Sequence, residues 1–140
     1  MSGRRPRLTF SRRALDKMID LAWSTYPSEV VGLLGGNRLR VKSVYGLRNL
    51  ASGLAFLADP HDQYQAMRKI ELAGERLIAT FHSHPEGAAK LSATDSQYVF
   101  EVASAAIVIG LRAAGHTTHL AAFKRAAGGI EETAEIVVQS

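Results

Sequence analysis

Two histidines and one aspartate near the middle of the chain have the residue types and spacing of a metal-binding set. The stretch reads FHSHPEGAAKLSATD from Phe81 to Asp95. Residues i and i+2 of an extended strand point to the same side, so His82 and His84 can face one point in space. The loop from Pro85 to Leu91 can bring Asp95 back to that point. Two imidazoles and a carboxylate hold catalytic zinc ions in proteins while leaving the fourth position to water.

A carboxylate far upstream adds a second chemical function. Glu29 stands in PSEVVGLLGG, where a strand is expected to begin. A carboxylate beside a zinc-bound water can take its proton and later pass it to a leaving amine. The simpler alternative is an exposed charge at a strand edge. The glycines that follow are not a phosphate-binding loop, because no Gly-Lys-Ser/Thr comes after them.

Together these residues resemble the JAMM (MPN+) zinc metalloprotease family. The motif is a glutamate, a long gap, His-x-His-x10-Asp, and a serine three residues before the aspartate. Every motif position is present: Glu29, His82, Ser83, His84, Pro85, Ser92 and Asp95. The stretches EVVGLLGG and Phe56-x-x-Asp59-Pro60 extend the likeness to the compact stand-alone prokaryotic members, over roughly residues 8–125.

The resemblance implies a fold, an activity and a role for each motif residue. The expected fold is a single α/β MPN domain over residues 1–140, related to cytidine deaminases, with a mixed central sheet flanked by helices and a basic, flexible lead over 1–7. The implied reaction is zinc-dependent cleavage after the Gly-Gly tail of a ubiquitin-like or sulfur-carrier protein, with Glu29 as general acid/base. The resemblance implies one Zn²⁺ per chain, held by His82, His84 and Asp95. Ser92 would stabilise the oxyanion, with Ser83 and Pro85 in support.

Several alternatives stay open beside this interpretation. The protein could be a non-catalytic MPN scaffold, or a zinc amidase that acts on small peptide conjugates. Ser92-x-x-Asp95 is also a capping-box pattern, with Ser92 at the start of a helix. A nucleobase deaminase is excluded, because the chain has no cysteine to provide that family's zinc ligands. The resemblance also leaves a homodimer open.

Composition places the chain among ordinary globular proteins. It has 140 residues, 46% of them apolar and 21% charged, which suits one hydrophobic core. No apolar run reaches the roughly 20 residues needed to cross a bilayer. The net charge is +4, with arginines crowding the start of the chain, and we interpret them as a solvated basic terminus. We therefore expect a soluble cytoplasmic protein with no nucleic-acid or membrane partner.

Periodicity and turn residues predict the elements that would carry the site. A short strand over 7–10 is followed by a helix with Ser11 as N-cap, which ends at Pro27. Residues 29–36 read as a buried strand, and the chain turns at Asn37. Residues 30–47 then form an antiparallel hairpin. A helix follows Asp59-Pro60 and ends near Gly74, and the strand over 76–83 delivers the histidines. Later elements are a helix from Ser92 to Ala103, strands over 106–110, 117–124 and 135–138, and a turn at Gly128-Gly129. His61 is expected at the surface, and His116 and His119 are expected at surface or hinge positions rather than at a second metal.

Overall fold

The computed structural model describes the chain except residues 1–6, 52–56, 93–94, 96–98, 100–101, 127–128 and 140. Its helices and strands follow one another as β1 (Arg7–Ser11), α1 (Arg12–Thr25), β2 (Val31–Asn37), β3 (Arg40–Leu47), α2 (Pro60–Leu72), β4 (Arg76–Pro85), β5 (Ala105–Arg112), η1 (Ala114–His116), β6 (Thr117–Ala126) and β7 (Gly129–Gln139). Asp95, Val99 and Val102 are also helical, and the backbone N–H of Ala103 donates to the carbonyl of Val99. The predicted helix after Ser92 is thus confirmed where it is described, while Tyr98 lies outside the described residues.

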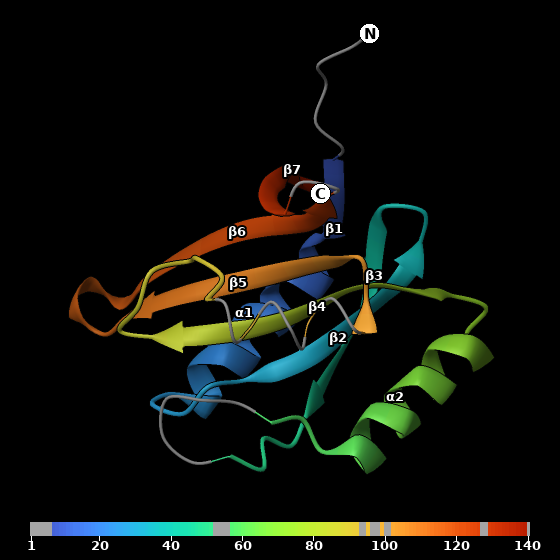
Figure 1. Ribbon diagram of the computed structural model, residues 1–140, viewed down its shortest axis with the longest axis horizontal. Coiled ribbons are helices and arrows are strands. Elements are labelled where there is room, and N and C mark those ends of the chain that lie inside the picture. The colour runs from blue at the N-terminus through green and yellow to red at the C-terminus, as the bar shows by residue number, and fades with distance from the viewer. Residues whose placement is uncertain are drawn as a thin grey trace, which may run out of the picture.

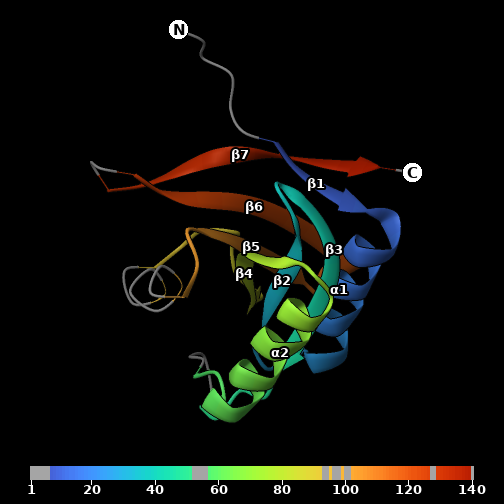
Figure 2. The same ribbon diagram turned by 90° about the vertical axis from the view of Figure 1, so that its right-hand side faces the viewer.

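The strands form one mixed sheet in the order β1-β3-β2-β4-β5-β6-β7. Strands β4 and β5 are parallel, and the hairpins β2–β3, β5–β6 and β6–β7 are antiparallel. Strand β1 pairs in parallel with both β3 and β7, which closes the sheet into a barrel. Figure 2 shows β7 and β1 side by side along one end of the molecule. The mixed sheet confirms the predicted fold, but its closure was not predicted.

Helix α1 covers one face of the sheet and begins as predicted. The hydroxyl of Ser11 accepts a hydrogen bond from the backbone N–H of Ala14, which satisfies one of the first-turn donors. The buried stripe on the helix packs into the core with strand residues such as Leu34, Phe81 and Ile109; its members are Ala14, Leu15, Met18 and Ala22. In Figure 1, α1 lies behind the strands.

Helix α2 covers the opposite face. The carboxylate of Asp59 accepts from the backbone N–H of His61, and Pro60 occupies the first turn, where a missing N–H costs nothing. Ala66 and Ile70 pack against Leu33, whose neighbour Leu34 points to the α1 side. After the helix, Gly74 adopts a φ of 73°, which fits the predicted stop.

The β2–β3 hairpin forms at the predicted place, but Glu29 and Val30 lie before β2 rather than in it. The carbonyl of Glu29 accepts a hydrogen bond from the side chain of Asn49 instead of a neighbouring strand. Within β2, a Cβ at Gly32 would collide with the ring of Phe81 and the carbonyl of Tyr45. The glycines therefore permit close approach of neighbouring chains, as expected.

Strand β7 is longer than predicted. The predicted strand covered only residues 135–138, whereas the strand runs from Gly129 to Gln139. Backbone pairing with β6 and β1 extends it beyond those residues, and Gly129 pairs with Ala126 rather than lying in a turn. Gly128, the other residue of that predicted turn, lies outside the described residues.

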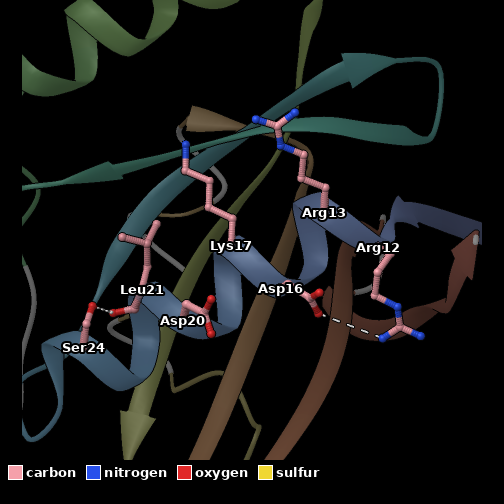
Figure 3. Close-up of a pocket in the computed structure, with 7 residues that line it drawn as sticks. All are labelled: Arg12, Arg13, Asp16, Lys17, Asp20, Leu21 and Ser24. Carbon is pink, nitrogen blue, oxygen red and sulfur yellow. Dashed lines mark hydrogen bonds and ion pairs between the residues drawn. The ribbon is translucent and has the colours of Figure 1, made fainter.

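The basic start of the chain is only partly described. Arg7 already belongs to β1, where it pairs with Glu135 at 3.3 Å. Figure 3 shows a shallow pocket on the outer face of α1, lined by Arg12, Arg13, Asp16, Lys17, Asp20, Leu21 and Ser24. Acids alternate with bases there, so the pocket has no field of a single sign. No helix within the described ranges is long and apolar enough to span a membrane.

Candidate metal centre

Strand β4 places the two histidines on one side of the chain, as their spacing predicted. Their Nε2 atoms lie 3.2 Å apart. His82 is fully buried and His84 is partly buried. Strand β4 lies between β2 and β5; β2 pairs with it as far as His82, and β5 pairs with it past His84.

Asp95 completes a tight triangle of donor atoms. Its Oδ2 lies 3.0 Å from the Nε2 of His82 and 2.9 Å from the Nε2 of His84. Donor atoms at about 2.0–2.1 Å from a tetrahedral zinc lie about 3.3 Å apart, so the triangle has the right size for one ion. These three residues form the one group of His, Asp and Glu side chains in the described part of the chain that could hold a metal.

The hydrogen bonds around His84 also fit metal binding. Its Nδ1 lies 2.9 Å from the carbonyl of Ala88, which can only accept, so this nitrogen carries the proton. A neutral His84 then directs the lone pair of Nε2 at the carboxylate of Asp95. Two acceptors at this distance require a proton or a cation between them.

The ionisation of the three residues agrees with that requirement. The hydrogen bond to Asp95 is the largest of the causes that raise the pKa of His84. Burial would raise the pKa of Asp95, but the hydrogen bonds from His82 and His84 lower it well below its usual range. Burial lowers the pKa of His82, which favours the neutral imidazole that binds metals. The deprotonated carboxylate of Asp95 thus lies beside an imidazole that binds a proton, at the position where a metal ion would lie.

Glu29 is buried close to these candidate ligands. It is 3% exposed, and its Oε2 has no hydrogen-bond partner among the described residues. Burial raises its pKa to about 7, while the charge of His84 lowers it and that of Asp95 raises it. The structure therefore keeps at this point a carboxyl group that can hold or release a proton near neutral pH.

Ser83 and Pro85 lie where the sequence predicted supporting residues. Ser83 is fully buried, and its hydroxyl accepts a hydrogen bond from the backbone N–H of Val30 at 2.9 Å. It therefore holds the segment that carries Glu29 rather than facing the ligands. Pro85 is the last residue of β4, and a turn begins at Glu86.

Ser92 takes the position of a helix N-cap. Its hydroxyl accepts from the backbone N–H of Asp95 at 3.0 Å, and its own N–H lies 3.4 Å from the Oδ2 of Asp95. This confirms the capping-box pattern. A hydroxyl that accepts one hydrogen bond keeps its hydrogen for donation, so capping does not conflict with the predicted contact to an oxyanion.

Three contributors to the site were not assigned a role from the sequence. Asn49 holds the carbonyl of Glu29, and its Oδ1 accepts from the backbone N–H groups of Ala51 and Leu57. Glu86 accepts a hydrogen bond from the backbone N–H of Ala113, and a Cβ at Gly110 would lie 2.8 Å from the carbonyl oxygen of Gly87, so both residues contact or carry the loop after β4. A glycine inside an apolar strand signals close backbone approach, so Gly110 carried a readable signal. The contact of Asn49 with Glu29 and those of Glu86 with Tyr26 and Ala113 join residues 20 or more positions apart, so no local pattern indicated them.

The remaining histidines lie outside the metal centre. His61 and His119 are exposed, and the ring of His116 stacks on Trp23 with centroids 3.9 Å apart. This confirms their predicted surface positions. Two segments, the loop over 85–91 and residues 49–57, are predicted as walls of a substrate cleft. The loop lies beside the candidate ligands, whereas 52–56 of the second segment lie outside the described residues.

Comparisons with known proteins agree with the geometry. Over 71 residues the chain is 41% identical to a probable TtuB-protein conjugate cleaving protease of Thermus thermophilus. The matched stretch covers 49% of this chain and 47% of that protein. It is 33% identical over 75 residues to a desampylase of Haloferax volcanii, covering 51% and 54% respectively. The matched stretches thus span about half the length of both relatives.

A solved structure shows the same fold along nearly the whole chain. The crystal structure of a JAB1/MPN domain protein from Archaeoglobus fulgidus superposes with a TM-score of 0.63 at 20% identity, covering 94% of this chain and 99% of that one. The family model described as prokaryotic homologs of the JAB domain matches residues 11–126, which include every candidate site residue. This chain therefore belongs to the prokaryotic homologues of the JAB domain, the JAMM/MPN family.

Proposed function

We propose that this protein is a zinc-dependent JAMM-type metallopeptidase. It hydrolyses the peptide or isopeptide bond after the Gly-Gly tail of a ubiquitin-like or sulfur-carrier protein. The observation that carries the proposal is the triangle of His82, His84 and Asp95 donor atoms beside a buried Glu29 whose pKa is raised to about 7. A metal ligand set with an adjacent proton carrier is what metal-dependent amide hydrolysis requires.

Each residue has a distinct part in this reaction. His82, His84 and Asp95 would hold the zinc ion, which when bound supplies Lewis acidity to a water molecule and a carbonyl group. Glu29 would take a proton from the attacking water and return it to the leaving nitrogen. Ser92, at the exposed edge of the centre, would donate its hydroxyl hydrogen to the oxygen on which negative charge develops.

The substrate class rests on the relatives. Two of them are named for removing protein conjugates, a TtuB-conjugate cleaving protease and a desampylase. A diglycine tail has no side chains, so it can lie extended in a narrow cleft and pair with a strand or loop. The loop over 85–91 borders the metal centre, and we propose it as one wall of that cleft.

A cleavage assay with matched variants tests the proposal. Ubiquitin-like and sulfur-carrier proteins would be fused through Gly-Gly to a reporter peptide, with Ala-Ala fusions as controls. We expect the zinc-loaded protein to cut after the second glycine, as read by mass spectrometry, and the Glu29→Ala variant to keep its zinc but lose cleavage.

Two other results would replace the proposal. Zinc binding without cleavage of any fusion would indicate a binding module. Cleavage of short peptide conjugates with all carrier fusions left intact would indicate a small-conjugate amidase. Undiminished turnover by Glu29→Ala would remove the role assigned to Glu29.

A further inference from the structure

Glu86, the residue after the His-Ser-His-Pro stretch, has an unusual backbone conformation and three hydrogen bonds. Its φ is 58°, in the left-handed region that non-glycine residues seldom adopt. Its N–H donates to the carbonyl of Leu111 at 2.6 Å. Its Oε2 accepts from the hydroxyl of Tyr26 at 2.6 Å and from the backbone N–H of Ala113 at 2.7 Å. One side chain thus joins the end of β4 to α1 and to the turn after β5.

The contact with Tyr26 reaches the segment that carries Glu29. Tyr26 is the C-cap residue of α1 and precedes Glu29 by three positions. Between them, the N–H of Ser28 donates to the carbonyl of Thr25. The segment from Tyr26 to Glu29 is therefore short and is held at both ends. Tyr26 hydrogen-bonds to Glu86, and Val30, the residue after Glu29, hydrogen-bonds to Ser83.

The backbone of Glu86 reaches the other half of the site. The next residue, Gly87, donates from its N–H to the carbonyl of His84, and the carbonyl of Ala88 accepts from the imidazole of His84 at 2.9 Å. The place of that carbonyl fixes the ring orientation and the tautomer of His84. Rotation of Glu86 out of its left-handed conformation would move the Ala88 carbonyl.

We propose that Glu86 is a positioning residue, which through Tyr26 and Ala113 holds the imidazole of His84 and the segment of Glu29 in one fixed relation. Its effect on turnover rests on the proposed function, whereas its effect on metal binding does not. Glu86 is exposed, so its side chain adds little to the buried core. A merely structural role would therefore leave metal affinity unchanged.

Metal titration of matched variants tests this inference. Affinity for Zn²⁺ would be measured by competition with a chromophoric chelator, with folding followed by circular dichroism. We expect Glu86→Ala to weaken zinc binding by about 10–100-fold, the usual loss when the hydrogen-bond partner of a metal ligand is disturbed, because the Ala88 carbonyl beside His84 would shift. Glu86→Gln keeps an acceptor oxygen for both donors and should restore most of that affinity. Glu135→Ala, which removes an exposed glutamate paired with Arg7, is the control and should match the unchanged protein.

Tyr26→Phe tests the link between the two halves of the site. It removes the hydroxyl but keeps the ring that packs beside Trp23. We expect it to lower kcat with little change in KM, and to add no further loss of kcat in the Glu86→Ala background, because both changes break the same bond. Wild-type zinc affinity in Glu86→Ala, equal losses in the Ala and Gln variants, or additive losses of kcat would each overturn the inference. Because zinc affinity needs no substrate, weaker zinc binding in Glu86→Ala would support it even if no Gly-Gly fusion were cleaved.

Discussion

Ser83, which lies between the two histidines of the metal centre, exchanges two hydrogen bonds with Val30. The N–H of Val30 donates to the Ser83 hydroxyl at 2.9 Å, and the N–H of Ser83 donates to the Val30 carbonyl at 3.1 Å. Both residues are buried. The strand that carries the candidate ligands is thus tied directly to the residue after Glu29, so the ligands and the proposed proton carrier cannot shift independently.

Ser83→Ala should weaken both the fold and turnover. The substitution leaves the N–H of Val30 buried without its side-chain acceptor, which costs about 1–3 kcal/mol of the free energy of unfolding. It also loosens the Glu29 segment, so we expect a lower kcat with zinc affinity nearly unchanged. Urea unfolding and cleavage kinetics measure the two effects.

Ser24→Ala is the matched control for that substitution. Ser24 is exposed on α1, where its hydroxyl donates to the carbonyl of Leu21. Its loss should change the free energy of unfolding by less than about 0.5 kcal/mol. Equal stability of the two alanine variants would contradict the importance given to the Ser83–Val30 contact.

The stability of the metal-free protein should depend on the protonation of Glu29. Its pKa is about 7 in the folded chain, against an ordinary value of 4.5. The folded state therefore binds this proton more tightly, so the contribution to stability is fully present below about pH 4.5 and is lost as the pH rises through 7. Unfolding by urea with a chelator present, from pH 4.5 to 8, measures this loss.

Glu29→Gln isolates that contribution from the other titrating groups. Glutamine imitates the protonated carboxyl group and does not titrate. The stability of the unchanged protein relative to this variant should therefore fall between pH 4.5 and about 7 and then level off, because above that pH the carboxyl group is ionised in both the folded and the unfolded chain. A difference that stays constant over this range would show that burial does not raise the pKa of Glu29.

Asp95→Ala should remove the stabilisation that zinc gives. The loss of one of the three donor groups should lower zinc affinity by more than about 100-fold, since losing a ligand's hydrogen-bond partner alone costs about 10–100-fold. Free zinc at 100 times its Kd stabilises a folded protein by about 2.7 kcal/mol. The midpoint of thermal unfolding should therefore fall for the unchanged protein when zinc is replaced by a chelator, and it should barely change for the Asp95→Ala variant.

Asp16→Ala serves as the control for the aspartate. Asp16 lies on the outer face of α1, 4.0 Å from Arg12, and its carboxylate is exposed. This variant should bind about one zinc per chain and respond to chelation like the unchanged protein. If Asp95→Ala retained the same zinc content and the same chelator response, Asp95 would not be a ligand.

The parts of the site that the sequence predicted are those with local signals. The period of two along a strand placed His82 and His84 on one side, and the cap residues Ser11 and Asp59 marked the starts of both labelled α-helices. Such signals arise from backbone geometry within a few residues. They remain readable whatever the rest of the chain does.

The parts that the sequence did not predict depend on contacts between distant segments. Sheet closure requires β1 to pair with β7, more than a hundred residues later. The sequence of neither strand alone therefore predicts this pairing. The left-handed conformation of Glu86 is held by Tyr26 and Ala113, from two other elements. No propensity of glutamate favours that conformation, which is why the role of Glu86 emerged only from the structure.

Gly110, which pairs with His84 across the β4–β5 ladder, should be required for tight metal binding although it is not itself a candidate ligand. A Cβ at this position of β5 would lie 2.8 Å from the carbonyl oxygen of Gly87 and 3.0 Å from the N–H nitrogen of Ala89. These are backbone atoms of the loop whose Ala88 carbonyl orients His84. Gly110→Ala must therefore push that loop outward, and we expect zinc affinity to fall by about 10–100-fold.

Gly46→Ala separates this steric effect from the general cost of adding a methyl group to a strand. A Cβ at Gly46 of β3 would meet only the side chain of Leu21, at 3.5 and 3.6 Å, which is ordinary van der Waals contact. Zinc titration and thermal unfolding of the two variants should show weakened binding only for Gly110→Ala. If Gly110→Ala bound zinc like Gly46→Ala, the loop could move without disturbing His84, and the Ala88 carbonyl would not control the ligand.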